Sequence, residues 1–365
     1  MVFNRPLSSF AYVLALAMTV WAVPAGSSEL GIDRSGLSMQ STAVQEKTLT
    51  DIRGLGAAWF RDGPTSGSAQ GVANFVNEIR LAKQRHLKVL ITIAQMDEDY
   101  DVPLQMHDRG WKAKKLSQID LAKFTQRFQS LLGALKAAGL TIDAVEFGSE
   151  DDSYYYDADV PYDHPATADE LHTWLRGYGA FLKTGATILH DPRYYPTAKI
   201  ITFGMAHGCD PCKGPPRHLI NPAWAVAMLK NVDGFNYLSN ATYHVDGYGT
   251  HIYVSPNYID GMATQMLRQD AAALGRDKSL WITEWGFLDL NAFPNKKGET
   301  LSQCIQVFLD TLDRLRTQIS IGPMMFYRYD TWLSDASGKL LPQAKVLATY
   351  TAKQSPQKGD AGGQL

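Results

Sequence analysis

The chain of 365 residues is 45% hydrophobic and carries a formal net charge of −2 at pH 7, so it can bury a large core. Because its charges are balanced and it has no long basic run, it lacks the positive electrostatic potential that binds nucleic acid or an anionic membrane.

Three cysteines are too few for a disulfide scaffold, although Cys209 and Cys212 are spaced to close a small loop disulfide in an exported protein. A redox or metal Cys-x-x-Cys is the weaker interpretation, because no second pair accompanies it. Cys304 lies in a helical pattern and is expected to be a buried thiol.

The first 25 residues have the pattern of a signal peptide. Arg5 precedes an uncharged stretch over residues 6–26 with an apolar centre, and Val23-Pro24-Ala25 supplies small residues before a cleavage point. An uncleaved membrane anchor is the alternative, but the apolar centre is short for a bilayer span. We therefore expect a secreted or periplasmic protein whose mature chain begins after Ala25.

Residues 26–352 repeat a unit of strand, loop and helix. The expected strands span residues 30–38, 57–61, 88–95, 142–147, 199–203, 248–254, 280–287 and 324–329. The expected helices span residues 42–54, 72–82, 117–138, 167–189, 222–229, 260–274, 301–315 and 342–350. Apolar residues recur at helical spacing in the helices and run almost without interruption in the strands. The tail over residues 353–365, rich in Gln, Gly, Lys and Asp, is expected to be disordered.

Eight consecutive units of this kind predict a single-domain α/β fold, the (β/α)8 TIM barrel. Nearly continuous apolar strands indicate parallel pairing with both faces buried, and eight is the number that closes such a barrel. A doubly wound open sheet is the alternative, but no Gly-rich phosphate-binding fingerprint follows an early strand to support it. In a TIM barrel the active site forms at the C-terminal ends of the strands.

Polar side chains gather at those expected strand ends. The apolar strand over residues 280–287 carries one carboxylate, Glu284, and a buried carboxylate persists where it is paired or used in chemistry. A second apolar strand, residues 142–147, leads to Glu150. The other polar or aromatic residues at or just beyond strand ends are Arg61, Asp62, Gln95, His207, His251, Tyr253, Tyr327, Arg328, Tyr329 and Trp332. Two strand-borne carboxylates in such company indicate acid–base or nucleophilic chemistry.

This set of residues resembles the large (β/α)8 superfamily of retaining glycoside hydrolases, clan A, in which two glutamates end strands four and seven. The resemblance covers about residues 30–352 and rests on the strand order and on the motif Ile282-Thr283-Glu284-Trp285-Gly286. It implies that Glu150 is the general acid/base, that Glu284 is the nucleophile, and that Arg61 orients the nucleophile. The substrate-binding set that we expect is Arg61, Gln95, Ser149, His251, Tyr253, Trp285, Tyr327 and Trp332, with Trp332 as the sugar platform.

One position departs from the superfamily pattern. The superfamily usually has Asn before the acid/base glutamate, where it contacts the sugar 2-hydroxyl, but this chain has Ser149. Three explanations are open. The sugar carries another group in place of the 2-hydroxyl, such as an acetamido group; a different residue makes the contact; or activity is reduced or lost. Glu146 competes with Glu150 for the acid/base role, but it lies further down the strand and is expected to be a structural carboxylate of the barrel interior.

The expected function is exported, retaining hydrolysis of O-glycosidic bonds in a poly- or oligosaccharide, through a covalent glycosyl-enzyme and without a metal or other cofactor. Exopolysaccharide-processing hydrolases are the neighbourhood that the resemblance suggests. One alternative, motivated by Ser149, is a carbohydrate-binding barrel with weak or no turnover. Another is metal-dependent hydrolysis using His207, His244 or His251. The aspartates within residues 151–163 follow no calcium-ligand spacing and are expected to form a solvated acidic loop.

Overall fold

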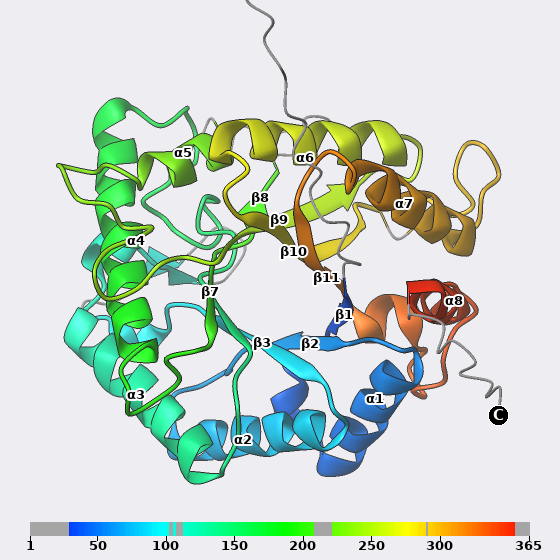
Figure 1. Cartoon of the computed structure of the whole chain (residues 1–365), viewed down its shortest axis with the longest axis horizontal. Helices are drawn as coiled ribbons and strands as arrows, with labels where there is room; N and C mark the ends of the chain where they lie inside the picture. The colour runs from blue at the N-terminus through cyan, green and yellow to red at the C-terminus, as the bar shows by residue number, and fades with distance from the viewer. Residues whose placement is uncertain (1–28, 102–104, 107–111, 208–220, 290, 355–365) are drawn as a thin grey trace, which may run out of the picture.

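Eight parallel strands close into a barrel in the computed structural model, which describes residues 29–101, 105–106, 112–207, 221–289 and 291–354 (Figure 1). The barrel strands are β1 Leu30–Asp33, β2 Trp59–Asp62, β3 Lys88–Ile93, β6 Ala144–Phe147, β7 Lys199–Thr202, β9 Gly247–Val254, β10 Ser279–Phe287 and β11 Ile321–Phe326. The strands pair side by side from β10 through β11 and β1 to β9, and the pairing of β9 with β10 closes the ring. The predicted (β/α)8 barrel is confirmed.

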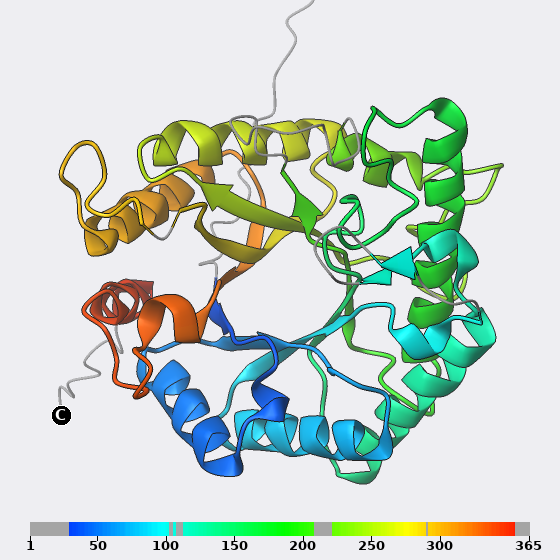
Figure 2. The same cartoon turned by 180° about the vertical axis from the view of Figure 1, so that it is seen from behind.

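Helices alternate with these strands and form an outer ring around the barrel, as both views show (Figures 1 and 2). They are α1 Thr42–Gly54, α2 Ala69–Gln84, α3 Leu121–Ala137, α4 Ala168–Leu189, α5 Pro222–Met228, α6 Ile259–Leu274, α7 Leu301–Leu315 and α8 Ala344–Gln354. The short elements are β4 Gln105–Met106, β5 Lys112–Ala113, β8 Met205–Ala206, the 3₁₀ helices Leu37–Met39, Asp97–Asp99 and Leu116–Gln118, and the π-helical turn Tyr329–Leu333. No helix within the described ranges is long and apolar enough to cross a membrane.

Local sequence signals fix several helix starts. Thr167 and Thr300 begin α4 and α7 with reciprocal capping boxes to Glu170 and Gln303. Such caps satisfy amides that the first helical turn leaves without partners, and each contributes about 1 kcal/mol. Asp120 caps α3 without a reciprocal partner, since its carboxylate accepts hydrogen bonds from the amides of Ala122 and Lys123, and this helix begins at Leu121 rather than at residue 117 as predicted.

Two further predicted boundaries differ from the structure. The first strand ends at Asp33, because the Asp62 carboxylate accepts hydrogen bonds from the amides of Gly36 and Leu37, both at 2.9 Å, and bends the chain into a 3₁₀ turn. The last helix continues to Gln354, so the first two residues of the predicted disordered tail are helical. The remaining tail, the predicted signal peptide and the Cys209–Cys212 pair lie outside the described residues.

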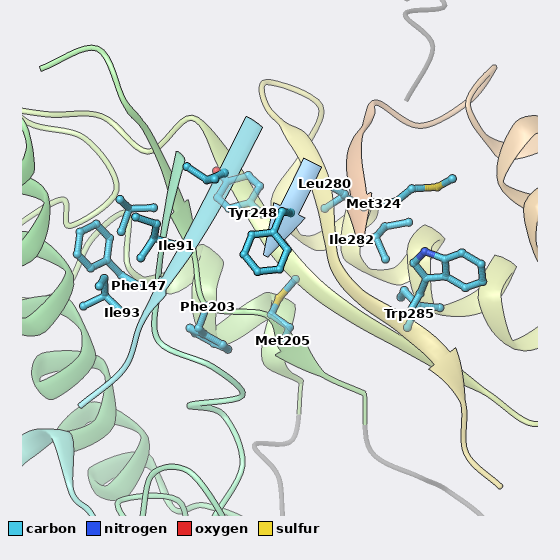
Figure 3. Packing of buried hydrophobic residues seen from close by; sticks show 14 of the residues in the cluster. Ile91, Ile93, Phe147, Phe203, Met205, Tyr248, Leu280, Ile282, Trp285 and Met324 are labelled. Carbon is cyan, nitrogen blue, oxygen red and sulfur yellow. The ribbon is translucent and has the colours of Figure 1, made fainter. Parts of the chain in front are cut away.

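Alternating strand residues divide the core into two regions. Outward-facing residues such as Phe147, Tyr248 and Trp285 pack beneath the helices (Figure 3). A smaller inner cluster consists of Trp59, Leu90, Ala144, Ile201, Trp281 and Met325. The rings of Trp59 and Trp281 meet edge to face with centroids 5.2 Å apart. In this inner cluster the barrel is filled by side chains, which leaves the C-terminal strand ends as the place for chemistry.

Candidate active site

Arg61 is the centre of a buried charge cluster contributed by four different strands. Its Nη1 donates to Asp33 Oδ2 on β1 and to Glu284 Oε1 on β10, both at 2.7 Å. Its Nε donates to Glu146 Oε2 on β6 at 2.8 Å. All four residues are at most 8% exposed. The predicted contact between Arg61 and Glu284 is confirmed, and so is the expectation that Glu146 is a carboxylate of the barrel interior.

The charges of this cluster hold each other in place. Burial alone would lower the pKa of Arg61, but the charges of Glu146, Glu284 and Asp33 raise it well above its ordinary value. Burial raises the pKa of Asp33 to about 6 even though Arg61 opposes the shift. Asp33 was not among the predicted site residues. The available signal was its position at the end of the first strand, on the inward side together with Arg61.

Glu284 is held in its ionised form by three cationic or hydroxyl neighbours. Tyr253 Oη donates to Glu284 Oε2 at 2.5 Å, and His251 Nδ1 lies 3.6 Å from the same oxygen. Burial alone would raise the pKa of Glu284, but the charges of His251 and Arg61 and the hydrogen bond from Tyr253 lower it below its ordinary value. An ionised carboxylate with fixed donors on both oxygens is suited to act as a nucleophile.

A register irregularity in β10 aims Glu284 into the site. The pairing with β9 shifts between Ile282 and Glu284, so that Thr283 and Glu284 both lie on the inward side, while Trp285 returns to the outside. Bulges of this kind recur beside active sites because they redirect a side chain. Without the shift, strict alternation from the inward-facing Trp281 would direct Glu284 toward the helices.

Glu150 approaches from the loop after β6. Its backbone has φ = 51°, in the left-handed region that non-glycine residues rarely adopt, and Gly148 before it has φ = 96°. Glu150 Oε1 lies 2.8 Å from His251 Nδ1. Ser149, which lies between Gly148 and Glu150 in the sequence, is half-buried. Burial would lower the pKa of His251, but the charge of Glu284 and the hydrogen bond with Glu150 raise it to about 9.

The two glutamates and His251 therefore form one compact group. One carboxylate oxygen of Glu150, one of Glu284 and a ring nitrogen of His251 all lie within 4.8 Å of one another. These donor types and distances also suit a divalent metal. However, a histidine that binds a metal usually donates its second N–H to a carboxylate or carbonyl, and His251 Nε2 is buried without a hydrogen-bond partner.

The other two histidines considered for metal binding lie elsewhere. His207 Nε2 contacts Asp270 Oδ2 on α6 at 3.0 Å and Thr250 Oγ1 at 3.1 Å. His244 pairs with Asp246 before β9 begins. The three histidines do not converge on one point, so the hypothesis of a multi-histidine metal centre loses its structural basis in the described residues.

Two further residues of the predicted binding set, Tyr327 and Gln95, lie beside Tyr253 and against the loop that carries Glu150. The Tyr327 ring lies 5.8 Å from that of Tyr253, centroid to centroid. Gln95 is 4% exposed, and its Nε2 donates to the carbonyl oxygen of Tyr156 at 2.7 Å, so it braces the loop after β6 instead of facing solvent. Tyr156 is 45% exposed at this rim, and the charge of Glu150 is the largest cause that raises its pKa.

The two predicted tryptophan contacts are corrected. Trp285 is fully buried outside the barrel, stacked on Phe308 of α7 with centroids 4.4 Å apart, and cannot touch a substrate. Trp332 is only 6% exposed and packs between Phe287 and Phe293, so it presents no open ring face as a sugar platform. Bulky aromatic residues at strand ends fit the hydrophobic core as well as a cleft, and sequence could not distinguish the two.

The acidic loop after β6 is also different from the prediction. Asp151, Asp152 and Asp157 are at most 1% exposed, whereas a solvated loop was expected. Asp152 accepts hydrogen bonds from the amide of Ala206 at 3.0 and 3.1 Å, and Asp157 accepts one from the amide of Leu116 at 3.2 Å. These carboxylates fasten the loop that carries Glu150 to its neighbours.

Solved structures of glycoside-hydrolase barrels share this fold at low sequence identity. A GH5_18 structure from Bifidobacterium longum subsp. infantis aligns with a TM-score of 0.59 and 12% identity, over 89% of this chain and 79% of that chain. GH5_18 from Streptomyces cattleya, in complex with GlcNAc, gives 0.59 and 12% over 91% and 81%. The endo-beta-1,4-mannanase from Thermotoga petrophila gives 0.55 and 13% over 92% and 78%. No protein-family model and no curated protein sequence matches the chain.

Proposed function

We propose that this chain is a retaining glycoside hydrolase that cleaves a poly- or oligosaccharide by double displacement. The observation that carries the proposal is the pair of glutamates with carboxylate oxygens within 4.8 Å of each other. Retaining pairs are about 5 to 5.5 Å apart, whereas inverting pairs leave about 6.5 to 9.5 Å for a water molecule. The mannanase and the GlcNAc complex among the similar structures support a carbohydrate as the ligand.

In the first step, Glu284 Oε attacks the anomeric carbon and the bond to the leaving oxygen breaks. Arg61 and Tyr253 keep the attacking carboxylate ionised and oriented. The leaving oxygen takes a proton from the Glu150–His251 pair, which holds one proton in its 2.8 Å hydrogen bond. In the second step, Glu150 removes a proton from water, the water oxygen bonds to the anomeric carbon, and Glu284 leaves as a carboxylate.

A mechanism-based inhibitor tests this assignment directly. A 2-deoxy-2-fluoroglycoside with a good leaving group is expected to form a long-lived ester. The fluorine slows both the formation and the hydrolysis of the glycosyl-enzyme, because both transition states resemble an oxocarbenium ion, and the good leaving group restores the rate of formation alone. Peptide mapping by mass spectrometry should find the sugar on Glu284. A panel of 2-fluoro gluco- and manno-type fluorides and a 5-fluoro N-acetylglucosamine-type fluoride covers the sugar classes, because the acetamido group of the last already occupies C2. Attachment to any other residue would overturn the assignment of the nucleophile.

A metal-dependent mechanism predicts a different result. If Glu150, His251 and Glu284 act as proposed, incubation with EDTA followed by gel filtration should leave hydrolysis unchanged. Loss of activity on chelation, with recovery on adding Zn²⁺, would instead assign the group as metal ligands. The same assay with the Glu284→Gln variant controls for unrelated hydrolase activity in the preparation.

The substrate and the location belong to the proposal as well. We propose an exported enzyme, because residues 6–26 are uncharged with an apolar centre and small residues follow it. The N-terminal sequence of the protein recovered outside the cytoplasm tests this, with a mature start after Ala25 as the expected result.

An exopolysaccharide is the proposed substrate class. A Ser149→Asn variant that gains activity on plain hexosides would show that Ser149 selects against them.

A further inference from the structure

Gly204 lies between β7 and β8, against the histidine that links the two glutamates. A Cβ atom built on Gly204 would lie 2.0 Å from His251 Nε2 and 2.2 Å from His251 Cδ2. It would also lie 2.7 Å from Thr283 Oγ1. Distances below 3.0 Å are not tolerated by real Cβ atoms. The position of the His251 ring therefore depends on residue 204 having no side chain.

The backbone of Gly204 contacts the second partner of His251. The carbonyl oxygen of Gly204 accepts a hydrogen bond from the Glu150 amide at 3.2 Å. The amide that donates this bond belongs to the residue with left-handed backbone geometry, Glu150. Gly204 thus touches both members of the Glu150–His251 pair, one through its carbonyl oxygen and the other through the space that it leaves.

From these contacts we propose that Gly204 is a positioning residue for the Glu150–His251 pair, and that it acts by seating the His251 ring against Glu150. This inference rests on the proposed function only for its consequence in catalysis. Movement of the ring is restricted, because His251 is 1% exposed and Thr283 adjoins the same space. An added methyl group must push the ring toward the glutamates, or push the Gly204 backbone and the Glu150 amide away. Either movement disturbs the 2.8 Å hydrogen bond of the pair.

The first measurement is independent of catalysis. Histidine side-chain NMR of the Gly204→Ala variant should show an altered titration of His251. In the native protein burial lowers the pKa of His251, but Glu284 and Glu150 raise it to about 9. The His251→Ala spectrum assigns the signal. Gly261→Ala is the matched control, because nothing lies within 4 Å of a Cβ at that helical position. An unchanged His251 titration in folded Gly204→Ala would overturn the proposal.

The second measurement is a double-mutant cycle on hydrolysis. Gly204→Ala should lower kcat/KM about 10²-fold, mainly through kcat, because a displacement near 1 Å in a catalytic group has an effect of that size. In a His251→Ala background the methyl group meets no ring, so the same change should have no further effect, and this double variant keeps the test available if Gly204→Ala alone does not fold. A further loss in that background would contradict the proposal. Absence of hydrolysis in the native protein would remove the proposed function and leave the NMR result to decide on Gly204.

Discussion

Replacing Glu284 by glutamine is expected to lower kcat/KM by about 10⁵-fold or more, because an amide cannot form the glycosyl-enzyme. Glutamine keeps the shape of the side chain and can still accept the hydrogen bond from Arg61 Nη1, which is 2.7 Å long in the native protein. The variant should therefore remain folded and bind substrate with little change in affinity. Initial rates and isothermal titration with the same oligosaccharide measure the two effects separately.

A Glu150→Gln variant serves as the contrast. It should also lose activity on substrates with a poor leaving group, but an activated substrate such as a nitrophenyl glycoside or glycosyl fluoride needs no protonation in the first step. The first step of Glu150→Gln should recover on such a substrate, whereas that of Glu284→Gln should not. Identical behaviour of the two variants would contradict the assigned roles. If the native chain binds sugar but never hydrolyses it, the carbohydrate-binding alternative is correct.

Replacing Arg61 by methionine is expected to lower the free energy of unfolding by about 3 to 5 kcal/mol near neutral pH, because removal of one partner leaves buried charge without compensation. Arg61 faces three carboxylates, those of Asp33, Glu146 and Glu284. Urea unfolding at fixed pH measures the loss. Arg193→Met is the matched control, since Arg193 pairs with Asp191 at 2.8 Å on the exposed surface, where an ion pair contributes little.

The loss at Arg61 should depend on pH in a defined direction. Without the guanidinium, Arg61 no longer offsets the burial that raises the folded-state pKa of Asp33 above its unfolded value of about 4, and Glu284 loses one of the two charges that lower its pKa. A raised folded-state pKa stabilises the folded form below the unfolded pKa, and this contribution disappears as the pH rises through the folded value. The difference between native and variant stability should therefore shrink as the pH falls from 8 toward 4. A difference that stays constant over this range would show that lost packing, and not charge, dominates.

The fold was predictable because each of its signals is local and repeated. Eight apolar strands alternate with helices whose apolar residues recur at the helical period, and caps such as Thr167 and Thr300 mark where helices begin. The pairing of Glu150, Glu284, Arg61, His251 and Tyr253 followed from strand order, since parallel strands of a barrel bring their C-terminal ends together. These five residues form one group in the structure, linked by three hydrogen bonds and by the 3.6 Å ion pair between His251 and Glu284.

What sequence could not supply was the direction of individual side chains. The register shift in β10 makes Glu284 face inward and Trp285 outward, and alternation counted along the strand cannot reveal where such a shift occurs. The same limit applies to Asp33, whose importance depends on contact with Arg61 across neighbouring strands. Gly204 gave no signal either, since its significance lies in the space that it leaves for His251.

The inner tryptophan pair has a consequence for the dielectric environment of the charge cluster. Trp59 and Trp281 are 4% and 3% exposed, and Lys88 and Lys199 lie over their rings at 5.5 and 5.6 Å from the centroids. Water therefore reaches Arg61 and Glu284 from the opposite, C-terminal mouth of the barrel. In the proposed reaction, a sugar bound in that mouth would displace this water, lower the local dielectric constant, and strengthen every charge interaction around Glu284.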